Sequence, residues 1–227
     1  MPLRAIVFDF DGVIANSEPL HFRAFRDILA KSNVDLSERD YYQRYLGFDD
    51  FGVFTTIGDD RGQEWSPRDV ADFVADKALR LEELERDVSV LFPGAADAIR
   101  RAAAAVPIAI ASGALGPEIR RILNKAGLTP YFAAIVSAED TPLGKPAPDP
   151  YERAVTLLRA TIQGPPLQPS ECVAIEDSRW GLESARAAGL RTVGVTNSYD
   201  AAQLTLADLV IGSLTDLDVE DLRRLVH

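Results

Sequence analysis

The sequence is short of cysteine and of positive charge. A single cysteine, Cys172, precludes a disulfide within the chain and indicates a reducing compartment. Its place before an apolar run favours a small buried side chain over a nucleophile. Aspartate and glutamate (35) outnumber lysine and arginine (24), which leaves a formal net charge of −11. So large a surplus of negative charge argues against nucleic acids and anionic membranes as partners.

Long apolar runs are lacking too. No stretch is long enough to span a bilayer, and the first residues do not show the basic-then-apolar pattern of an export signal. Together with the cysteine content, this predicts a cytoplasmic protein. We expect a monomer or weak homodimer, with no membrane and no nucleic acid among its partners.

What the sequence does contain is an alternation of short apolar runs and helical patterns. The 227 residues suit one large domain, or a domain that carries an insertion. Strands that alternate with helices are typical of right-handed βαβ units and a parallel sheet. Residues 17–88 show helical periodicity and no convincing strand. We therefore predict an α/β fold, with a Rossmann-like parallel sheet core (1–16 and 89–227) and an inserted helical domain (17–88).

The expected elements follow from the periodicity of apolar residues. Strands are expected at 5–8, 107–111, 133–137, 173–175, 192–195 and, more weakly, 208–211. Helices are expected at 18–31, 37–46, from 66 onward, 95–105, 118–126, 150–160, 181–188 and 216–225. Ser17 is the expected N-cap of the first helix. Ser66-Pro67-Arg68-Asp69 has the serine, proline and acid of a well-capped start.

Two aspartates directly follow the first expected strand. Asp9 and Asp11 are two residues apart, so on an extended chain they point the same way, and Gly12 lets the backbone turn away. Ligands of open α/β sheets bind outside the carboxyl ends of the strands. A capped turn would explain Asp-Gly alone. Two carboxylates after a buried strand favour a divalent metal held by oxygens, with one carboxylate free to attack.

Three more polar signals follow expected strands. Ser112-Gly113 offers a hydroxyl and backbone N–H groups that can hold a phosphate oxygen, although Ser-Gly is also a common turn. Lys145 is flanked by prolines that fix the backbone around its cation, and a solvated lysine in a proline turn is the simpler alternative. Glu176-Asp177-Ser178 repeats the pattern of acids at the end of a strand.

These signals converge on one edge of the sheet, because the carboxyl ends of parallel strands meet there. Asp9 and Asp177 supply the hard oxygens that suit Mg²⁺, and Ser112 and Lys145 supply donors for an anion. At an effective dielectric of about 20, two unit charges about 4 Å apart interact by about 4 kcal/mol. A carboxylate that approaches a phosphate therefore needs Mg²⁺ and the lysine to offset the repulsion.

In this order, the motifs resemble those of the haloacid dehalogenase superfamily of phosphotransferases. The resemblance covers nearly the whole chain, including a helical cap after the first motif. In detail the chain is similar to the branch that holds phosphoglycolate phosphatases and β-phosphoglucomutase, which Ser17-Glu18-Pro19-Leu20-His21 also fits. The matching motifs are Asp9-Phe10-Asp11-Gly12-Val13, Ser112-Gly113, Lys145-Pro146-Ala147-Pro148-Asp149 and Ile175-Glu176-Asp177-Ser178.

The resemblance implies catalytic and metal-binding roles. Asp9 would be the nucleophile that forms an aspartyl-phosphate. Asp11 would protonate the leaving alkoxide and then activate water. Mg²⁺ would be held by Asp9, the Asp11 backbone carbonyl and Asp177, with Glu176 in or next to that shell.

The resemblance also implies how the phosphoryl group is held. Ser112, Gly113 and Lys145 would bind the transferring group. The peptide bond between Lys145 and Pro146 is expected to be cis.

In the cap, the resemblance implies substrate contacts by Glu18, His21, Gly47 and Lys77. A helix-face histidine without substrate contact and a solvated helix lysine are the open alternatives for His21 and Lys77. The mutase carries a Lys-Gly-x-Ser-Arg loop, whose arginine grips a second phosphate. Here Asp50 stands where that arginine would fall. A bisphosphate intermediate would be repelled, which argues against mutase activity.

Three functional hypotheses remain. Dehalogenase relatives lack an acid at the position of Asp11, because no leaving oxygen needs a proton, so Asp11 points to phosphate esters. The leading hypothesis is a Mg²⁺-dependent phosphatase of a small phosphorylated metabolite. A sugar phosphomutase of the β-phosphoglucomutase kind is the alternative enzyme. A non-catalytic relative that binds a partner through its cap is the third.

Overall fold

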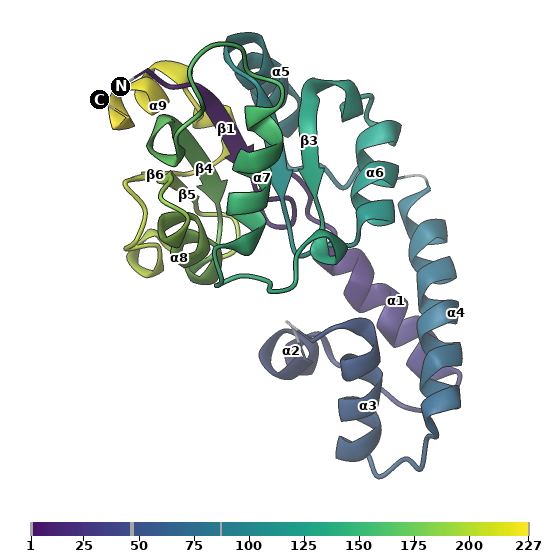
Figure 1. The fold of residues 1–227 in the computed structure, drawn as a ribbon. Helices are drawn as coiled ribbons and strands as arrows, with labels where there is room; N and C mark the ends of the chain where they lie inside the picture. The colour runs from purple at the N-terminus through teal and green to yellow at the C-terminus, as the bar shows by residue number, and fades with distance from the viewer. Residues whose placement is uncertain (1, 46–47, 87, 227) are drawn as a thin grey trace. The chain divides into compact units, whose positions relative to one another are not determined.

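The chain divides into two compact units. The computed structural model describes residues 2–45, 48–86 and 88–226. One unit comprises residues 1–16 and 90–227, and the other is the intervening segment 17–89 (Figure 1). Within the described residues, no helix combines the length and the hydropathy that crossing a bilayer requires.

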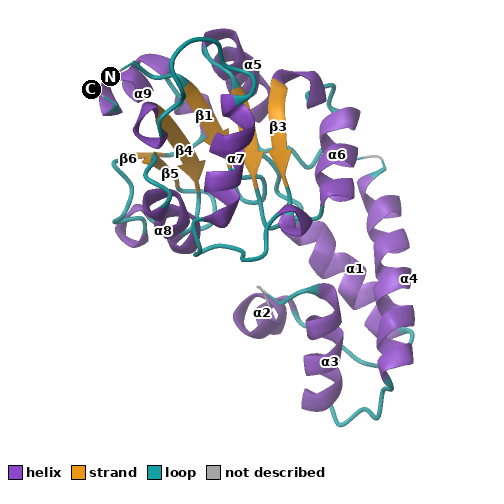
Figure 2. Cartoon of the chain, viewed as in Figure 1, coloured by secondary structure: helices purple, strands orange, loops and turns teal. Residues whose placement is uncertain are grey.

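The first unit is built on a parallel sheet (Figure 2). Its described strands lie in the order β3-β2-β1-β4-β5-β6, so the chain switches from one side of β1 to the other between β3 and β4. The α/β class and the Rossmann-like core are as predicted. In such sheets the switch point opens a crevice at the carboxyl ends of the strands. The strands are β1 Ala5–Phe8, β2 Ile108–Ala111, β3 Phe132–Val136, β4 Cys172–Glu176, β5 Arg191–Val195 and β6 Leu209–Ile211.

The sheet is buried on both faces, which is why its central strands are continuous apolar runs. All four residues of β1 are buried. Val7 is in register with Ala109 on one side and Ala174 on the other, and these side chains form a core with Tyr151 of α7 (Asp149–Arg159) and Ala185 of α8 (Arg179–Ala187). Helices α7 and α8 cover this face, and α5 (Ala95–Ala105) lies across the sheet from them (Figure 1).

The helices of the first unit connect its parallel strands. The expected and observed bounds differ mainly at the ends, as for α6, which begins at Gly116 rather than at residue 118. The helices are α5 Ala95–Ala105, α6 Gly116–Lys125, α7 Asp149–Arg159, α8 Arg179–Ala187 and α9 Val219–Leu225. Short 3₁₀ turns lie at Thr129–Tyr131, Ala138–Asp140, Pro169–Glu171, Ala201–Gln203 and Leu214–Asp216.

The regular elements described in the second unit are all helical. Helices α1 and α3 pack on α4, around a core that includes Phe25 and Phe54, whose ring centroids are 5.1 Å apart. The elements are α1 Glu18–Ala30, α2 Glu38–Asp40, a π-helical turn Tyr41–Tyr45, α3 Asp50–Asp60 and α4 Pro67–Glu85.

One expectation in this unit was wrong, and one helix was not foreseen. The segment 37–46 is not one α-helix, because only Glu38–Asp40 is α-helical before the backbone widens into the π-helical turn. Helix α3 was not expected at all. Its N-cap is Asp49, whose side chain accepts a hydrogen bond from the Gly52 N–H.

Of the two predicted helix caps, the one at Ser66 is confirmed and the one at Ser17 is wrong. The Ser66 hydroxyl accepts from the Asp69 N–H, and the Asp69 carboxylate accepts from the Ser66 N–H, so the expected capping box is present. Ser17 precedes α1, but its side chain makes no capping hydrogen bond. Its φ of −79° and ψ of −25° are already helical, whereas a capping side chain reaches the N–H groups from extended backbone.

The two ends of the inserted unit are tied together by the main chain of the first unit. The Asn16 N–H donates to the Val90 carbonyl at 2.7 Å, and the Phe92 N–H donates to the Ile14 carbonyl at 3.0 Å. An antiparallel bridge joins Ala15 to Leu91. The chain therefore leaves the core and returns to it at a single hydrogen-bonded point.

Candidate active site

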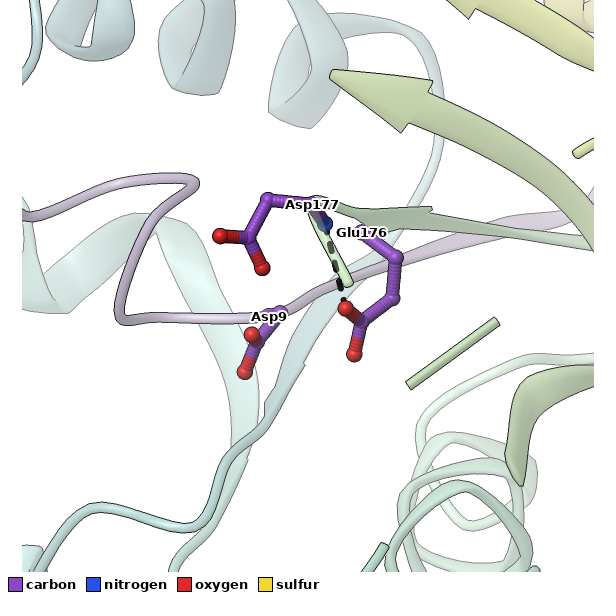
Figure 3. A group of neighbouring side chains, drawn as sticks. All are labelled: Asp9, Glu176 and Asp177. Carbon is purple, nitrogen blue, oxygen red and sulfur yellow. Dashed lines mark hydrogen bonds between the residues drawn. The ribbon is translucent and has the colours of Figure 1, made fainter. Parts of the chain in front are cut away.

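Three carboxylates from distant parts of the sequence meet beyond β1 and β4 (Figure 3). The two strands are paired, with Phe8 beside Ile175, and the next residue, Asp9, donates its N–H to the Ile175 carbonyl at 2.9 Å. The parallel register therefore carries Asp9 to the same sheet edge as Glu176 and Asp177. Ligand oxygens of these three buried residues lie within 4.8 Å of one another.

Two glycines make room for the carboxylates. A Cβ on Gly12 would lie 1.8 Å from Asp177 Oδ2, and a Cβ on Gly181 would lie 1.8 Å from Glu176 Oε1. Gly12 also has a φ of +75°, in the left-handed region that disfavours other residues. Each acid thus packs against backbone that only glycine can supply.

Glu176 has both carboxylate oxygens engaged by the protein. Oε1 accepts from Lys145 Nζ at 2.5 Å and from the Tyr151 hydroxyl at 2.9 Å. Oε2 accepts from the N–H groups of Asp177 and Ser178, at 3.1 and 3.3 Å, and from the Ser178 hydroxyl at 3.2 Å. Sequence reasoning did not find Tyr151, because nothing in its spacing distinguishes it from an ordinary core residue of α7.

Lys145 lies between two of the acids. Its Nζ is 2.6 Å from Asp9 Oδ1 and 2.5 Å from Glu176 Oε1, and it lies 5.3 Å from the centroid of the Tyr151 ring. The Lys145–Pro146 peptide is cis, as the resemblance implied. The lysine is therefore not the solvated side chain of a proline turn.

Burial and mutual repulsion shift the titration of this cluster. Burial, followed by the charge of Glu176, raises the pKa of Asp9 well above its usual value, although Lys145 opposes the shift. The same two causes raise the pKa of Asp177 to about 7. Burial alone would lower the pKa of Lys145, but the carboxylates of Asp9 and Glu176 outweigh it and raise that pKa. The site disfavours its own full negative charge.

The donor set fits a hard divalent cation. Carboxylate oxygens are the ligands that Mg²⁺ prefers. The raised pKa values of Asp9 and Asp177 mean that a nearby cation would stabilise their ionised forms. Because the oxygens of Glu176 already accept five hydrogen bonds, Asp9 and Asp177 are the better placed to ligate an ion directly.

The remaining core residues predicted for the site share this sheet edge. Ser112 and Gly113 follow β2, which pairs with β1. Ser112 is buried, with its hydroxyl accepting from the Ala114 N–H at 3.0 Å, whereas Gly113 is exposed. Asp11 lies in the turn after β1, where it bridges to Ala15. Its side chain does not belong to the acid cluster of the described residues, and the resemblance assigned only its carbonyl to the metal.

Comparison with known proteins decides the family. The model of the haloacid dehalogenase-like hydrolases matches residues 3–189. The chain belongs to this family. It is a phosphoric monoester hydrolase of the branch that the sequence motifs indicated.

Relatives align with the haloacid dehalogenase-like chain over most of its length. Protein CbbY of Rhodobacter capsulatus is 35% identical, over 88% of each chain. Hexitol phosphatase B of Escherichia coli K12 is 31% identical, over 96% of each. A crystal structure of a CbbY variant from Rhodobacter sphaeroides, in complex with xylulose-(1,5)bisphosphate, superposes with a TM-score of 0.79 at 28% identity, over 96% of each chain.

The residues predicted for substrate contact belong to the second unit. Gly47 lies outside the described residues. Glu18, at the start of α1, accepts a short hydrogen bond from the Tyr41 hydroxyl. His21, one turn further along α1, has its Nδ1 2.9 Å from Lys77 Nζ.

Lys77 is not a solvated helix lysine. It is 1% exposed on α4, and its ammonium donates to Asp50 Oδ1 and Oδ2 at 2.8 and 2.9 Å. It also lies 4.7 Å from the centroid of the Phe25 ring. Asp50, whose charge was expected to repel a second phosphate, is thus neutralised by Lys77. A charged lysine ammonium can only donate, so it pairs with His21 Nδ1 in the neutral tautomer that carries its proton on Nε2.

Two polar residues of this hydrolase escaped the sequence reasoning. Asn197 and Ser198 follow β5 at the sheet edge where the other signals gather. Asn197 Nδ2 donates to the Gly12 carbonyl at 2.8 Å, and Ser198 Oγ and Asp177 Oδ2 both approach the place that a Cβ on Gly12 would take. The rule that found Ser112 and Asp177, polar residues just beyond a strand, would also have found these.

Proposed function

We propose that this chain is a Mg²⁺-dependent phosphatase that hydrolyses a small phosphorylated sugar through an aspartyl-phosphate intermediate. The observation that carries the proposal is the meeting of Asp9, Asp177 and Lys145 at one sheet edge. A nucleophilic carboxylate beside a cation site and a lysine is what phosphoryl transfer requires, because its transition state spreads negative charge over the phosphoryl oxygens.

Asp9 attacks phosphorus, and the bond from phosphorus to the ester oxygen breaks. Asp11 gives its proton to the departing alkoxide, then takes a proton from the water that hydrolyses the aspartyl-phosphate. The two steps return both aspartates to their starting states and release inorganic phosphate.

Asp9, Asp177 and the Asp11 carbonyl would hold the Mg²⁺, with Glu176 beside them. The bound ion supplies charge neutralisation between the carboxylates and the phosphoryl oxygens. Glu176 orients Lys145 through its hydrogen bond, and Ser112, Gly113 and Lys145 bind the phosphoryl group.

The sugar substrate is supported by the relatives. Hexitol phosphatase B aligns over 96% of this chain, and the CbbY structure contains a sugar bisphosphate. We assign substrate selection to the helical unit 17–89, with Glu18, His21 and Gly47 as contacts and Lys77 as the residue that fixes the His21 tautomer. Asp50 neutralises the Lys77 charge that a second phosphate would need, which favours a phosphatase over a mutase.

Phosphate release across sugar phosphates, phosphoglycolate and nucleotides tests the proposal, with Mg²⁺ and with a chelator. We expect Mg²⁺-dependent release that is fastest on sugar monophosphates. Asp9→Asn should abolish it, and Asp97→Asn, which removes an exposed acid paired with Arg100, is the matched control. Turnover that survives chelation or Asp9→Asn overturns the mechanism. Interconversion of sugar phosphates without phosphate release establishes the mutase instead.

A further inference from the structure

Two consecutive side chains in the loop after β5 lie next to the Gly12 turn and the Asp177 carboxylate. Asn197 Nδ2 donates to the Gly12 carbonyl at 2.8 Å, across 185 positions of sequence. The Ser198 hydroxyl lies beside the Asp177 carboxylate, because the oxygens of both side chains approach the place that a Cβ on Gly12 would take. Asn197 thus holds the turn that carries Asp9 and Asp11, and Ser198 lies next to a proposed metal ligand.

The two contacts converge on Gly12. A Cβ on Gly12 would meet Asp177 Oδ2 at 1.8 Å and Ser198 Oγ at 2.9 Å, so the Asp177 carboxylate and the Ser198 hydroxyl both close on this backbone. The turn is also fixed from its other side, where the Gly12 N–H donates to the Ala15 carbonyl at 2.9 Å. The peptide before Gly12 is therefore held through its N–H, and the peptide after Gly12 through its carbonyl.

We propose that Asn197 and Ser198 are positioning residues, Asn197 for the Asp11 acid–base turn and Ser198 for the metal ligand Asp177. The proposal rests on the function argued above. Hydrogen bonds to a metal ligand orient it, and their loss typically costs about 10- to 100-fold in metal affinity or activity. A general acid displaced by a fraction of an ångström loses rate in the step that needs its proton.

The same loop offers a matched control. Thr196 Oγ1 donates to the Gly212 carbonyl at 3.3 Å, away from the Gly12 turn. Thr196→Val therefore loosens the loop but leaves the Asn197 and Ser198 contacts in place. Ser198→Thr retains a hydroxyl, and Asn197→Gln retains an amide donor, so these are the conservative variants.

The role of Ser198 is tested by titrating Mg²⁺ into the substrate-free protein in a calorimeter at one fixed pH. Ser198→Ala should weaken Mg²⁺ binding by about tenfold, with Ser198→Thr recovering most of the loss and Asn197→Ala and Thr196→Val close to the parent protein. The readout needs no turnover, so it stands even if the proposed phosphatase activity fails. Equal affinity in Ser198→Ala and the parent, or an equal loss in Thr196→Val, overturns this role.

The role of Asn197 is tested by comparing kcat on two substrates whose leaving groups differ in their need for a proton. An aryl phosphate with an acidic phenol departs with little help, whereas an alkyl phosphate needs a proton. Asn197→Ala should lower kcat on the alkyl phosphate by about tenfold or more, and on the aryl phosphate by less than about threefold, with Asn197→Gln intermediate. An equal loss on both substrates, or none on either, overturns the positioning of Asp11 by Asn197. Circular dichroism of each variant confirms that it is folded.

Discussion

Gly12 and Asp177 occupy adjoining space so tightly that a methyl group on the glycine would sit 1.8 Å from the carboxylate oxygen. Gly12→Ala should therefore displace Asp177 and lower both Mg²⁺ affinity and kcat/KM by about 100-fold or more. Calorimetry and steady-state kinetics measure the two losses.

The Gly127→Ala variant is the control that separates the steric clash at Gly12 from the strain of a positive φ. Gly127 also has a positive φ, +66°, but among the described residues nothing lies within 4 Å of the place that a methyl group would take there. The variant should lose stability, by about 1–2 kcal/mol, and keep its activity. Comparable loss of Mg²⁺ affinity in both variants would show that the close approach at Gly12 is unimportant.

Asp9→Asn should remove activity without lowering stability in the absence of Mg²⁺. Burial and the charge of Glu176 raise the pKa of Asp9, so ionising this carboxyl costs more in the folded protein than in the unfolded chain. Lys145 keeps Glu176 as a partner after the substitution. Thermal unfolding at about pH 8 should give a melting temperature equal to or above the parent's. A marked fall would mean that the Asp9–Lys145 pair outweighs the repulsion.

Lys145→Met should destabilise the metal-free protein as well as weaken phosphate binding. The substitution leaves Asp9 and Glu176 without the cation that both contact, and breaking a buried pair in this way costs about 3–5 kcal/mol. Urea unfolding measures the loss, and Mg²⁺ should restore part of it. Lys125→Met, at an exposed position on α6, is the control. An unfolding free energy close to the parent's would exclude this role for Lys145.

Mg²⁺ affinity should depend on pH near neutrality. The pKa of Asp177 is raised to about 7 by burial and then by Glu176, so below that pH a proton competes with the ion. Displacement of the Asp177 proton alone should lower the apparent affinity by about tenfold for each pH unit below 7. Titration in buffers of different ionisation enthalpy counts the proton released. If the Mg²⁺ affinity does not change between about pH 6 and about pH 8, the assignment of Asp177 as a ligand is contradicted.

The same shift fixes the sign of the stability change in the metal-free protein. Asp177 holds its proton to higher pH in the folded chain than in the unfolded chain, so between about pH 4 and about pH 7 the folded state binds more protons. The free energy of unfolding therefore falls as pH rises through that window.

The Asp50–Lys77 pair should show strong energetic coupling. Lys77 is almost fully buried, and both Asp50 oxygens accept from it. A double-mutant cycle with Asp50→Asn and Lys77→Met should give a coupling energy on the order of 1–3 kcal/mol. The exposed pair Lys31–Asp76 in the same unit should give about 0–1 kcal/mol. Similar coupling energies in the two pairs would mean that Lys77 behaves energetically like an exposed surface lysine.

The sequence predicted the sheet and the position of the candidate site, because the polar residues of the site directly follow recognisable strands. The run Ala5 to Phe8 indicated β1, and the acids after it could be placed at the sheet edge, because parallel strands end together. Helix α3 could not be predicted in the same way. Gly52 and Gly58 lower its intrinsic helix propensity, and the helix is retained because Phe54 is buried in the core of its unit.

Partners within the site were beyond reach for a different reason. That Lys145 contacts acids could be argued from charge, but the hydrogen bond from Tyr151 to Glu176 depends on how α7 packs against β4. The contact of Asn197 with Gly12 depends on the path of one loop. Such contacts are set by tertiary packing, which residue spacing does not encode.

The seam at which Asn16 meets Val90 has an evolutionary consequence. Because the main chain closes on itself there, everything between these residues behaves as a cassette whose replacement leaves the reactive groups of the first unit untouched. With substrate selection assigned to the helical unit as proposed above, exchange at this one seam would change the specificity of a lineage and leave its chemistry unchanged.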